Sequence, residues 1–256
     1  MLGLGQRTQQ TKTYRNMTSI NKTARLAGLV YLILIINGII NLMYIPSKLI
    51  VWDSASQTFE NITNSELLFR WGIVSGIITF LAFLVLPLVL YKLLNKVNVA
   101  QAKLMVIFVL VSIPISFVNI LNKFSVLTLI EKGMYLESMG ENDLQTQVMM
   151  HLDYYNNGIE ISQIFWGLWL LPFGYLVYKS DFLPKLLGVL LMAGGIGYLI
   201  TFFGGFLYSD FHKTMFSTIV GIPASIGEIG ICLWLLIMGT NTISFKKRKG
   251  NTLTKT

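Results

Sequence analysis

A single acidic residue, Glu228, lies inside a long uncharged stretch near the end of the chain. It is the one charged residue between Thr214 and Phe245. A charged carboxylate at the centre of a membrane helix costs about 3 kcal/mol on insertion scales, so such a group is protonated or paired with a cation such as Arg70 or Lys123. A buried ionisable group suggests a functional site, but a structural ion pair or a neutral hydrogen-bonded acid fits the sequence equally well.

Other polar residues recur at helical spacing within apolar stretches. Steps of three and four residues place side chains on one face of a helix. One such series is Ser112, Ser116, Asn119 and Lys123. Glu66 and Arg70 are also one turn apart, and this spacing suits an ion pair between them.

Enzyme motifs give no further chemistry. The sequence contains no HExxH, GxSxG or phosphate-loop motif, so we predict no catalytic residue, no cofactor and no metal site. A zinc site at the mouth of the outer loops is a weaker alternative, because His and acidic residues fall in outer segments and are more often solvated or helix-capping. Its ligands would be drawn from His151, Asp153, Glu160, Asp210 and His212.

Six long apolar stretches must position these residues. Each is long enough to cross a hydrocarbon core, which requires about 20 apolar residues in a helix. A hydrophobic content of 54% agrees with a single membrane domain. The sequence therefore predicts an all-α bundle of six transmembrane helices within a membrane domain over 24–240. The predicted helices cover approximately 24–45, 66–94, 102–126, 157–179, 184–208 and 215–239.

The positions of Lys and Arg predict the orientation of the bundle. Of the 20 basic residues, 15 fall in the N-terminal segment, the second and fourth gaps and the C-terminal segment. By the positive-inside rule, both termini are then cytoplasmic and the acidic loops face outward. The net charge of +8 follows from this topology, so it needs no nucleic-acid partner.

Outside the bundle, we expect two basic tails and short outer loops. We predict a disordered basic cytoplasmic tail over residues 1–23 and a second basic cytoplasmic tail over 241–256. In the longest outer loop, the stretch from Leu127 to Met139 is expected to form a separate short amphipathic helix. The first outer loop, Pro46 to Ser65, is polar.

Orientation brings the polar residues of different helices to one level. In helices that run outward, the polar residues lie near the C-terminal end, and in helices that run inward they lie near the N-terminal end. Both positions are on the outer side of the membrane, so the sequence predicts a polar vestibule that opens outward. The candidate vestibule residues are Asn41, Glu66, Arg70, Asn119, Lys123, His151, Asp153, Glu160, Gln163, Ser225 and Glu228. Interhelical hydrogen bonding without further function is the alternative for the Asn and Ser residues.

Several sequence blocks together resemble one bacterial family. They include Thr23 to Leu32, Ser65 to Gly72, Phe182 to Leu191 and the ending Glu228 with Cys232 to Ile237. As a set they are similar to the bacterial domain of unknown function 4386 family over nearly all of residues 20–240. The resemblance implies a six-span protein of the bacterial inner (cell) membrane and supplies no activity.

Three functional classes follow from these observations. A binding, accessory or sensor protein fits the lack of catalytic motifs and the small loops. A small-solute or proton-coupled transporter fits the buried acid, and an enzyme acting on a lipid or extracytoplasmic substrate fits the outer His and acidic residues. We favour the first class and expect membrane lipid as a partner. Assembly as a homo-oligomer or with a partner membrane subunit is open, and the ligand is unknown.

Overall fold

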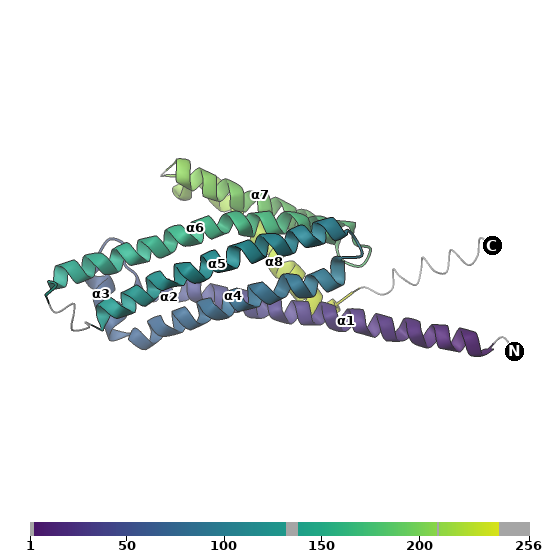
Figure 1. Ribbon diagram of the computed structural model, residues 1–256. Coiled ribbons are helices and arrows are strands. Elements are labelled where there is room, and N and C mark those ends of the chain that lie inside the picture. Colours follow the sequence, from purple (N-terminus) through teal and green to yellow (C-terminus); the bar gives the residue numbers. More distant parts are fainter. Residues whose placement is uncertain (1–2, 132–137, 209, 241–256) are drawn as a thin grey trace. The chain divides into compact units, whose positions relative to one another are not determined.

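The computed structural model describes residues 3–131, 138–208 and 210–240, with side chains from residue 19 onward. Every regular element in these residues is a helix, as Figure 1 shows. Six helices are long and apolar enough to cross a membrane, which confirms the predicted all-α, six-helix class. These spans are Ser19–Leu49, Glu66–Leu94, Val99–Ile130, Glu141–Lys179, Lys185–Leu207 and Met215–Met238.

The first span is built from three consecutive helical segments. Helix α1 (Gly3–Ile39) passes into a π-helical turn, η1 (Ile40–Tyr44), and then into α2 (Ile45–Leu49). The α1 backbone is helical from Gly3, in contrast to the disordered tail predicted over residues 1–23. The physical reason is that no Gly or Pro lies between residue 5 and the start of the apolar stretch, so nothing in the sequence ends the helix there.

The first interhelical segment, identified from the sequence as a polar outer loop, contains a helix. Helix α3 (Ala55–Asn64) begins after Ser54, whose side chain accepts a hydrogen bond from the backbone N–H of Gln57. This is the usual way in which a serine satisfies a free donor at a helix start. The polar sequence therefore encodes a capped amphipathic helix with Thr58, Phe59 and Ile62 buried.

The remaining helices are α4 (Glu66–Leu94), α5 (Val99–Ile130), α6 (Glu141–Lys179), α7 (Lys185–Leu207), η3 (Phe211–Lys213), α8 (Met215–Leu233) and the π-helical η4 (Trp234–Met238). In the described part of the stretch from Leu127 to Met139, predicted from the sequence as a separate short helix, residues 127–130 belong to α5. Helix α6 starts at Glu141 and continues without a break into the membrane-spanning part. Residues 132–137 of the predicted helix, and the predicted tail 241–256, lie outside the described residues.

Contacts divide the chain into two compact units. The internal unit consists of Ile33–Leu84 and Val109–Trp166, and the terminal unit consists of Met1–Leu32, Val85–Phe108 and Gly167–Thr256. Helices α1, α4, α5 and α6 contribute residues to both. We describe each unit by itself.

In the internal unit, the parts of α5 and α6 run side by side in opposite directions (Figure 1). As the residue numbers of the contacting residues increase along α5, the numbers of their partners on α6 decrease. The meeting pairs are Ser116 with Ser162, Asn119 with Tyr155, and Asn122 with His151. The predicted face of α5 is thus confirmed as buried, with Ser112, Ser116, Asn119 and Lys123 each at most 6% exposed.

In the terminal unit, α7 packs closely on two neighbours through glycines. A Cβ added to Gly194 would lie 2.5 Å from the Cα of Ala224 on α8, and one added to Gly195 would lie 2.7 Å from the carbonyl oxygen of Gly167 on α6. Backbones can approach this closely only where no side chain intervenes. The preceding residue, Ala193, is exposed, so Gly194 provides this contact with α8.

The first and last spans also meet within the terminal unit. The backbone carbonyl of Gly28 on α1 accepts a hydrogen bond from the thiol of Cys232 on α8, with 3.5 Å between Sγ and O. Near the end of this pair, the Asn21 side-chain oxygen accepts hydrogen bonds from the Thr240 backbone N–H at 2.8 Å and from its hydroxyl at 2.7 Å. The adjacent Gly239 has a φ of 63°, a left-handed conformation that favours glycine at the end of a helix.

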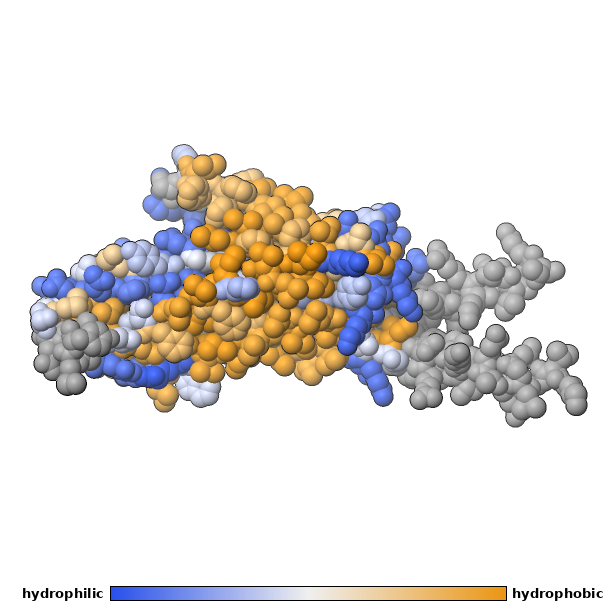
Figure 2. Space-filling model, in the orientation of Figure 1, coloured by the Kyte–Doolittle hydropathy of each residue, from blue (hydrophilic) through white to orange (hydrophobic). Residues whose placement is uncertain are grey.

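The outer surface of the helices is apolar. Figure 2 shows hydrophobic residues gathered over the middle parts of the helices and hydrophilic residues toward the helix ends. Many large apolar residues on this surface are exposed, among them Leu121, with 59% of its surface exposed, and Phe206, with 75%. Such an exposed apolar surface suits contact with lipid tails, in agreement with an integral membrane protein.

Candidate functional site

Lys123 is the most deeply buried charged residue of the predicted vestibule, with 4% of its surface exposed. Its Nζ donates to the side-chain oxygen of Asn41 at 2.6 Å and lies 4.2 Å from the centre of the Tyr155 ring. In the part of the chain that the structure describes, no carboxylate pairs with Lys123. An amide oxygen and an aromatic face are therefore the groups that stabilise this buried ammonium.

A chain of hydrogen bonds holds the partners of Lys123 in place. The Asn41 amide nitrogen donates to the Tyr155 hydroxyl at 3.0 Å, and the Asn119 amide nitrogen donates to the Tyr155 backbone carbonyl at 2.8 Å. Asn122 donates to the Asn119 side-chain oxygen at 3.1 Å, and a ring nitrogen of His151 lies 3.4 Å from the Asn122 side-chain oxygen. We call these six residues, Lys123, Asn41, Tyr155, Asn119, Asn122 and His151, the Lys123 network.

Two glycines make room for this network. A Cβ on Gly76 of α4 would lie 3.1 Å from the Asn41 amide nitrogen, and a Cβ on Gly158 of α6 would overlap the Asn119 side chain. The π-helical turn η1 contains Asn41 itself, and π-helical turns occur frequently at functional sites. The backbone of three elements is therefore shaped around the two asparagine side chains.

A cavity of about 190 Å³ adjoins the network. It is lined by Asn41, Leu42, Pro46, Ile50, Trp52, Lys123, Leu152, Tyr155 and Asn156, and we call it the Lys123 cavity. A lysine ammonium has three donors, and its described partners are one amide oxygen and one ring face. The remaining donor capacity of Lys123 is available to a hydrogen-bond acceptor or an anion in the cavity.

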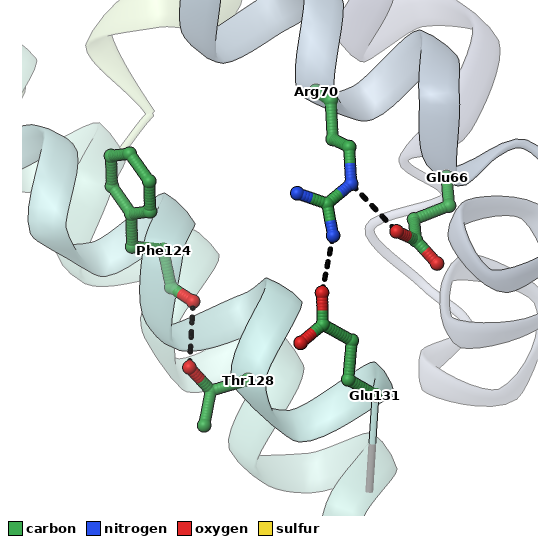
Figure 3. A network of polar contacts seen from close by, with 5 residues as sticks. All are labelled: Glu66, Arg70, Phe124, Thr128 and Glu131. Atoms are coloured by element: carbon green, nitrogen blue, oxygen red, sulfur yellow. Dashed lines mark hydrogen bonds and ion pairs between the residues drawn. The ribbon is translucent and has the colours of Figure 1, made fainter. Parts of the chain in front are cut away.

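A second polar group of the internal unit lies at the surface. Figure 3 shows Arg70 of α4 between Glu66, one turn before it, and Glu131 at the end of α5. The predicted pair of Glu66 and Arg70 is confirmed, with 2.6 Å between Nε and Oε1. Because the Arg70 side chain is 43% exposed and both its partners are acids, this group suits a structural link between α4 and α5 at the membrane surface.

Glu228 belongs to the terminal unit, where two tyrosines bind its carboxylate. The Tyr31 hydroxyl of α1 donates to Oε2 at 2.8 Å and the Tyr198 hydroxyl of α7 donates to Oε1 at 3.2 Å. The cation partners considered from the sequence, Arg70 and Lys123, have the other partners given above. Of the alternatives that the sequence left open for Glu228, the hydrogen-bonded acid agrees with these contacts, because phenol donors within its own unit bind both oxygens.

This arrangement predicts how Glu228 variants behave. Glu228→Leu should lower the free energy of unfolding by about 2 kcal/mol, because it leaves the hydroxyl of the fully buried Tyr31 without its acceptor. Glu228→Gln keeps an acceptor and the side-chain shape, so its cost should stay below about 1 kcal/mol. Thermal unfolding of the purified protein in a neutral detergent measures both. Equal losses in the two variants would contradict this role and would show that the ionised acid itself is required.

The other predicted vestibule residues are not drawn into either group. Asp153 and Ser225 are exposed, and the Ser225 hydroxyl bonds to the Gly221 carbonyl of its own helix. Glu160 and Gln163 are half-buried on α6. The remaining candidate vestibule residues thus belong to the Lys123 network and the Arg70 group of the internal unit or to the Glu228 site of the terminal unit.

The zinc alternative finds no support in the described residues. In them, no three His, Cys, Asp or Glu side chains come together in a group that could hold a metal ion. His151 instead belongs to the Lys123 network and packs edge-on against Tyr154, with ring centres 5.9 Å apart.

Sequence reasoning missed three tyrosines and an asparagine. Tyr155, Tyr31 and Tyr198 each donate or receive hydrogen bonds at the sites above, and Asn122 links Asn119 to His151. Tyr155 could have been found, because it follows His151 by four residues and therefore shares its helix face. Nothing in the sequence relates Tyr31 or Tyr198 to Glu228.

Comparison with known proteins adds a family and a distant relative. A family model described as a domain of unknown function (DUF4386) matches residues 26–239. An uncharacterized protein of the archaeon Archaeoglobus fulgidus is 31% identical over 81 residues, which are 32% of this chain and 46% of that protein. The chain thus matches less than half of that relative's length. No solved structure matches the chain.

Proposed function

The chain is a multi-pass membrane protein that belongs to the DUF4386 family, and from this premise we propose that it binds a small anionic ligand in the Lys123 cavity and acts as a binding or accessory protein. The observation that carries the proposal is the buried Lys123 ammonium, which lines a cavity and has only neutral partners among the described residues.

Energetics supports a ligand role for Lys123. Burying a charged group is costly unless it is paired, and natural proteins retain such groups mainly where function requires them. A purely structural position would be served as well by an uncharged residue of similar shape, such as methionine. An anion in the cavity would supply the opposite charge that the described residues do not provide.

We propose that the Lys123 cavity opens on the extracytoplasmic side of a bacterial inner (cell) membrane. The alternating distribution of the basic residues supports this orientation. Reporter fusions placed after Asn95 and after Glu141 should then report the cytoplasm and the outer side respectively. A periplasmic signal from the fusion after Asn95 would reverse the proposed orientation.

Ligand binding can be measured directly on the purified protein. Sodium benzoate is a suitable probe, because a cavity of about 150 Å³ is known to accept benzene and benzoate adds a carboxylate. Its addition should raise the thermal unfolding midpoint of the wild type, since a ligand at about 100 times its Kd adds about 2.7 kcal/mol of stability. Lys123→Met should abolish this increase.

Two controls make the result specific to the site. Lys103→Met removes an exposed lysine from the same helix and should leave the benzoate response unchanged. Benzyl alcohol, which has a similar ring and no charge, should give a much smaller increase. An equal response of the wild type and Lys123→Met to benzoate would rule out the Lys123 cavity as the binding site.

A further inference from the structure

We infer that the ligand of the Lys123 cavity is an anionic amphiphile, whose carboxylate or phosphate head group contacts Lys123 and whose apolar part lies along Pro46, Ile50 and Trp52. This inference rests on the proposed function and narrows it to a chemical class of ligand. Three observations support it: the division of the cavity lining, the position of the cavity along the helices, and the hydrogen bonds that hold one part of the cavity wall.

The cavity lining separates into a polar part and an apolar part. The polar part contains Lys123, Asn41, Tyr155 and Asn156, whereas the apolar part is Leu42, Pro46, Ile50, Trp52 and Leu152. The cavity volume of about 190 Å³ is below the range of about 300 to 1,000 Å³ that is usual for complete ligand sites. A head group and a short apolar segment would fill it, and the rest of a longer ligand would extend from the opening.

The cavity lies where an amphiphile in a membrane changes from polar to apolar. Lys123 directly follows the uncharged stretch that ends at Asn122, and Pro46 stands next to the end of the stretch that closes at Ser47. Both positions mark the boundary between the hydrocarbon core and the polar interface. Trp52, which is 46% exposed at the cavity, has the amphipathic ring that is enriched at this level.

Hydrogen bonds from α3 hold one part of the cavity wall in place. The buried Thr58 hydroxyl accepts a hydrogen bond from the Val51 backbone N–H and donates to the Val51 carbonyl, both at 2.9 Å. Asn61 donates to the Leu49 carbonyl at 3.3 Å. These bonds hold the segment that carries Ile50 and Trp52. A wall that is fixed before binding loses little conformational entropy when the ligand arrives.

The chemistry of the network determines the head group. Lys123 and the amide of Asn156 offer donors to the cavity, and Asn41 is already engaged by Lys123 and Tyr155. Pro46 has no backbone N–H, so this part of the wall presents no competing donor. An ammonium next to amide donors suits a carboxylate or a phosphate, and the two head groups share this recognition.

The test compares head group and tail separately in the full-length protein, reconstituted in nanodiscs of a neutral lipid. The probes are sodium octanoate, octyl phosphate, sodium acetate and octanol, and the readout is the half-saturating concentration for the increase in the thermal unfolding midpoint. Burial of only two methylenes contributes about tenfold in affinity, so octanoate or octyl phosphate should act at least about tenfold below acetate. Octanol should have little effect.

Variants assign the effect to the cavity. Lys123→Met should abolish the response to octanoate, and Trp52→Ala should weaken it by at least about threefold while leaving the weak acetate response unchanged. Leu121→Ala, which shortens an apolar side chain that is 59% exposed on α5, is the matched control and should change neither response. A stronger effect of octanoate identifies a fatty-acid-like carboxylate, and a stronger effect of octyl phosphate identifies a lipid phosphate.

The possible failures are distinguishable. If acetate is as potent as octanoate, the amphiphile is excluded while anion binding at Lys123 stands. If octanol is as potent as octanoate, or if Lys123→Met responds like the wild type, the head group does not contact Lys123 and the inference is wrong. If neither benzoate nor any of the anionic probes acts on the wild type, the proposed function itself fails.

Discussion

Replacing Asn41 with leucine is expected to lower the free energy of unfolding by about 3 kcal/mol, although leucine is the more apolar residue in a membrane helix. The change removes the Asn41 side-chain oxygen, which lies 2.6 Å from the Lys123 Nζ and is the only hydrogen-bond acceptor described for this ammonium. It also removes the Asn41 amide nitrogen that donates to the Tyr155 hydroxyl. A buried donor that loses its acceptor costs about 1 to 3 kcal/mol, and more when it is charged. Thermal unfolding in neutral detergent should show a fall of roughly 6 to 12 °C.

The neighbouring Asn37 provides the matched control. Its amide donates to the Ile33 carbonyl of its own helix at 2.9 Å, so Asn37→Leu should change the midpoint little. The double variant Asn41→Leu/Lys123→Met should regain most of the lost stability, because no buried charge then needs a partner. If the double variant is as unstable as Asn41→Leu alone, the loss comes from packing at η1 and Lys123 is not its cause.

A second large effect is expected from one methyl group on α7. Gly194→Ala should destabilise the protein by about 3 kcal/mol, because the new Cβ would lie 2.5 Å from the Ala224 Cα and 2.8 Å from its backbone nitrogen. Backbone atoms of a packed helix cannot move aside as a flexible side chain can, so α7 and α8 must separate. Loss of the folded fraction in detergent, followed by gel filtration and thermal unfolding, measures the effect.

Gly221 on α8 is the control for this substitution. A Cβ added there meets no heavy atom within 4 Å, so Gly221→Ala should be neutral or stabilise the helix by up to about 1 kcal/mol. A similar loss in both variants would mean that helix propensity or insertion is responsible. Close packing of α7 on α8 would then not be the cause.

The class of fold was predictable because it depends on local composition. Uncharged stretches of sufficient length define the spans whatever their neighbours are, and the pair of Glu66 and Arg70 forms within one turn of a single helix. Helix ends were less predictable. The polar residues from Glu141 onward continue the helix that enters the membrane, because hydrophobicity determines where a helix meets lipid and does not determine where it ends.

The partners of the polar residues could not be read from the sequence. Asn37 and Asn41 look alike as two asparagines one turn apart on an apolar helix, yet one bonds to its own backbone and the other to α5 and α6. Charge alone suggested cations for Glu228, whereas the structure supplies tyrosines. Which helices become neighbours depends on close packing at positions such as Gly158 and Gly194, and one sequence does not specify those pairs.

The contact of α1 with α8 has a consequence for how the protein is made. Tyr31 and Glu228 are 197 residues apart, and Asn21 and Thr240 are 219 apart, so the first span to be synthesised binds the last one. During translation, α1 enters the bilayer long before its partner exists, and contacts between such distant residues form late. Until α8 is inserted, the Gly28 carbonyl and the Tyr31 hydroxyl lack the partners that α8 supplies in the folded protein. The fold around α1 can therefore be completed only after α8 has been inserted, and a chain truncated before α8 would lack these contacts.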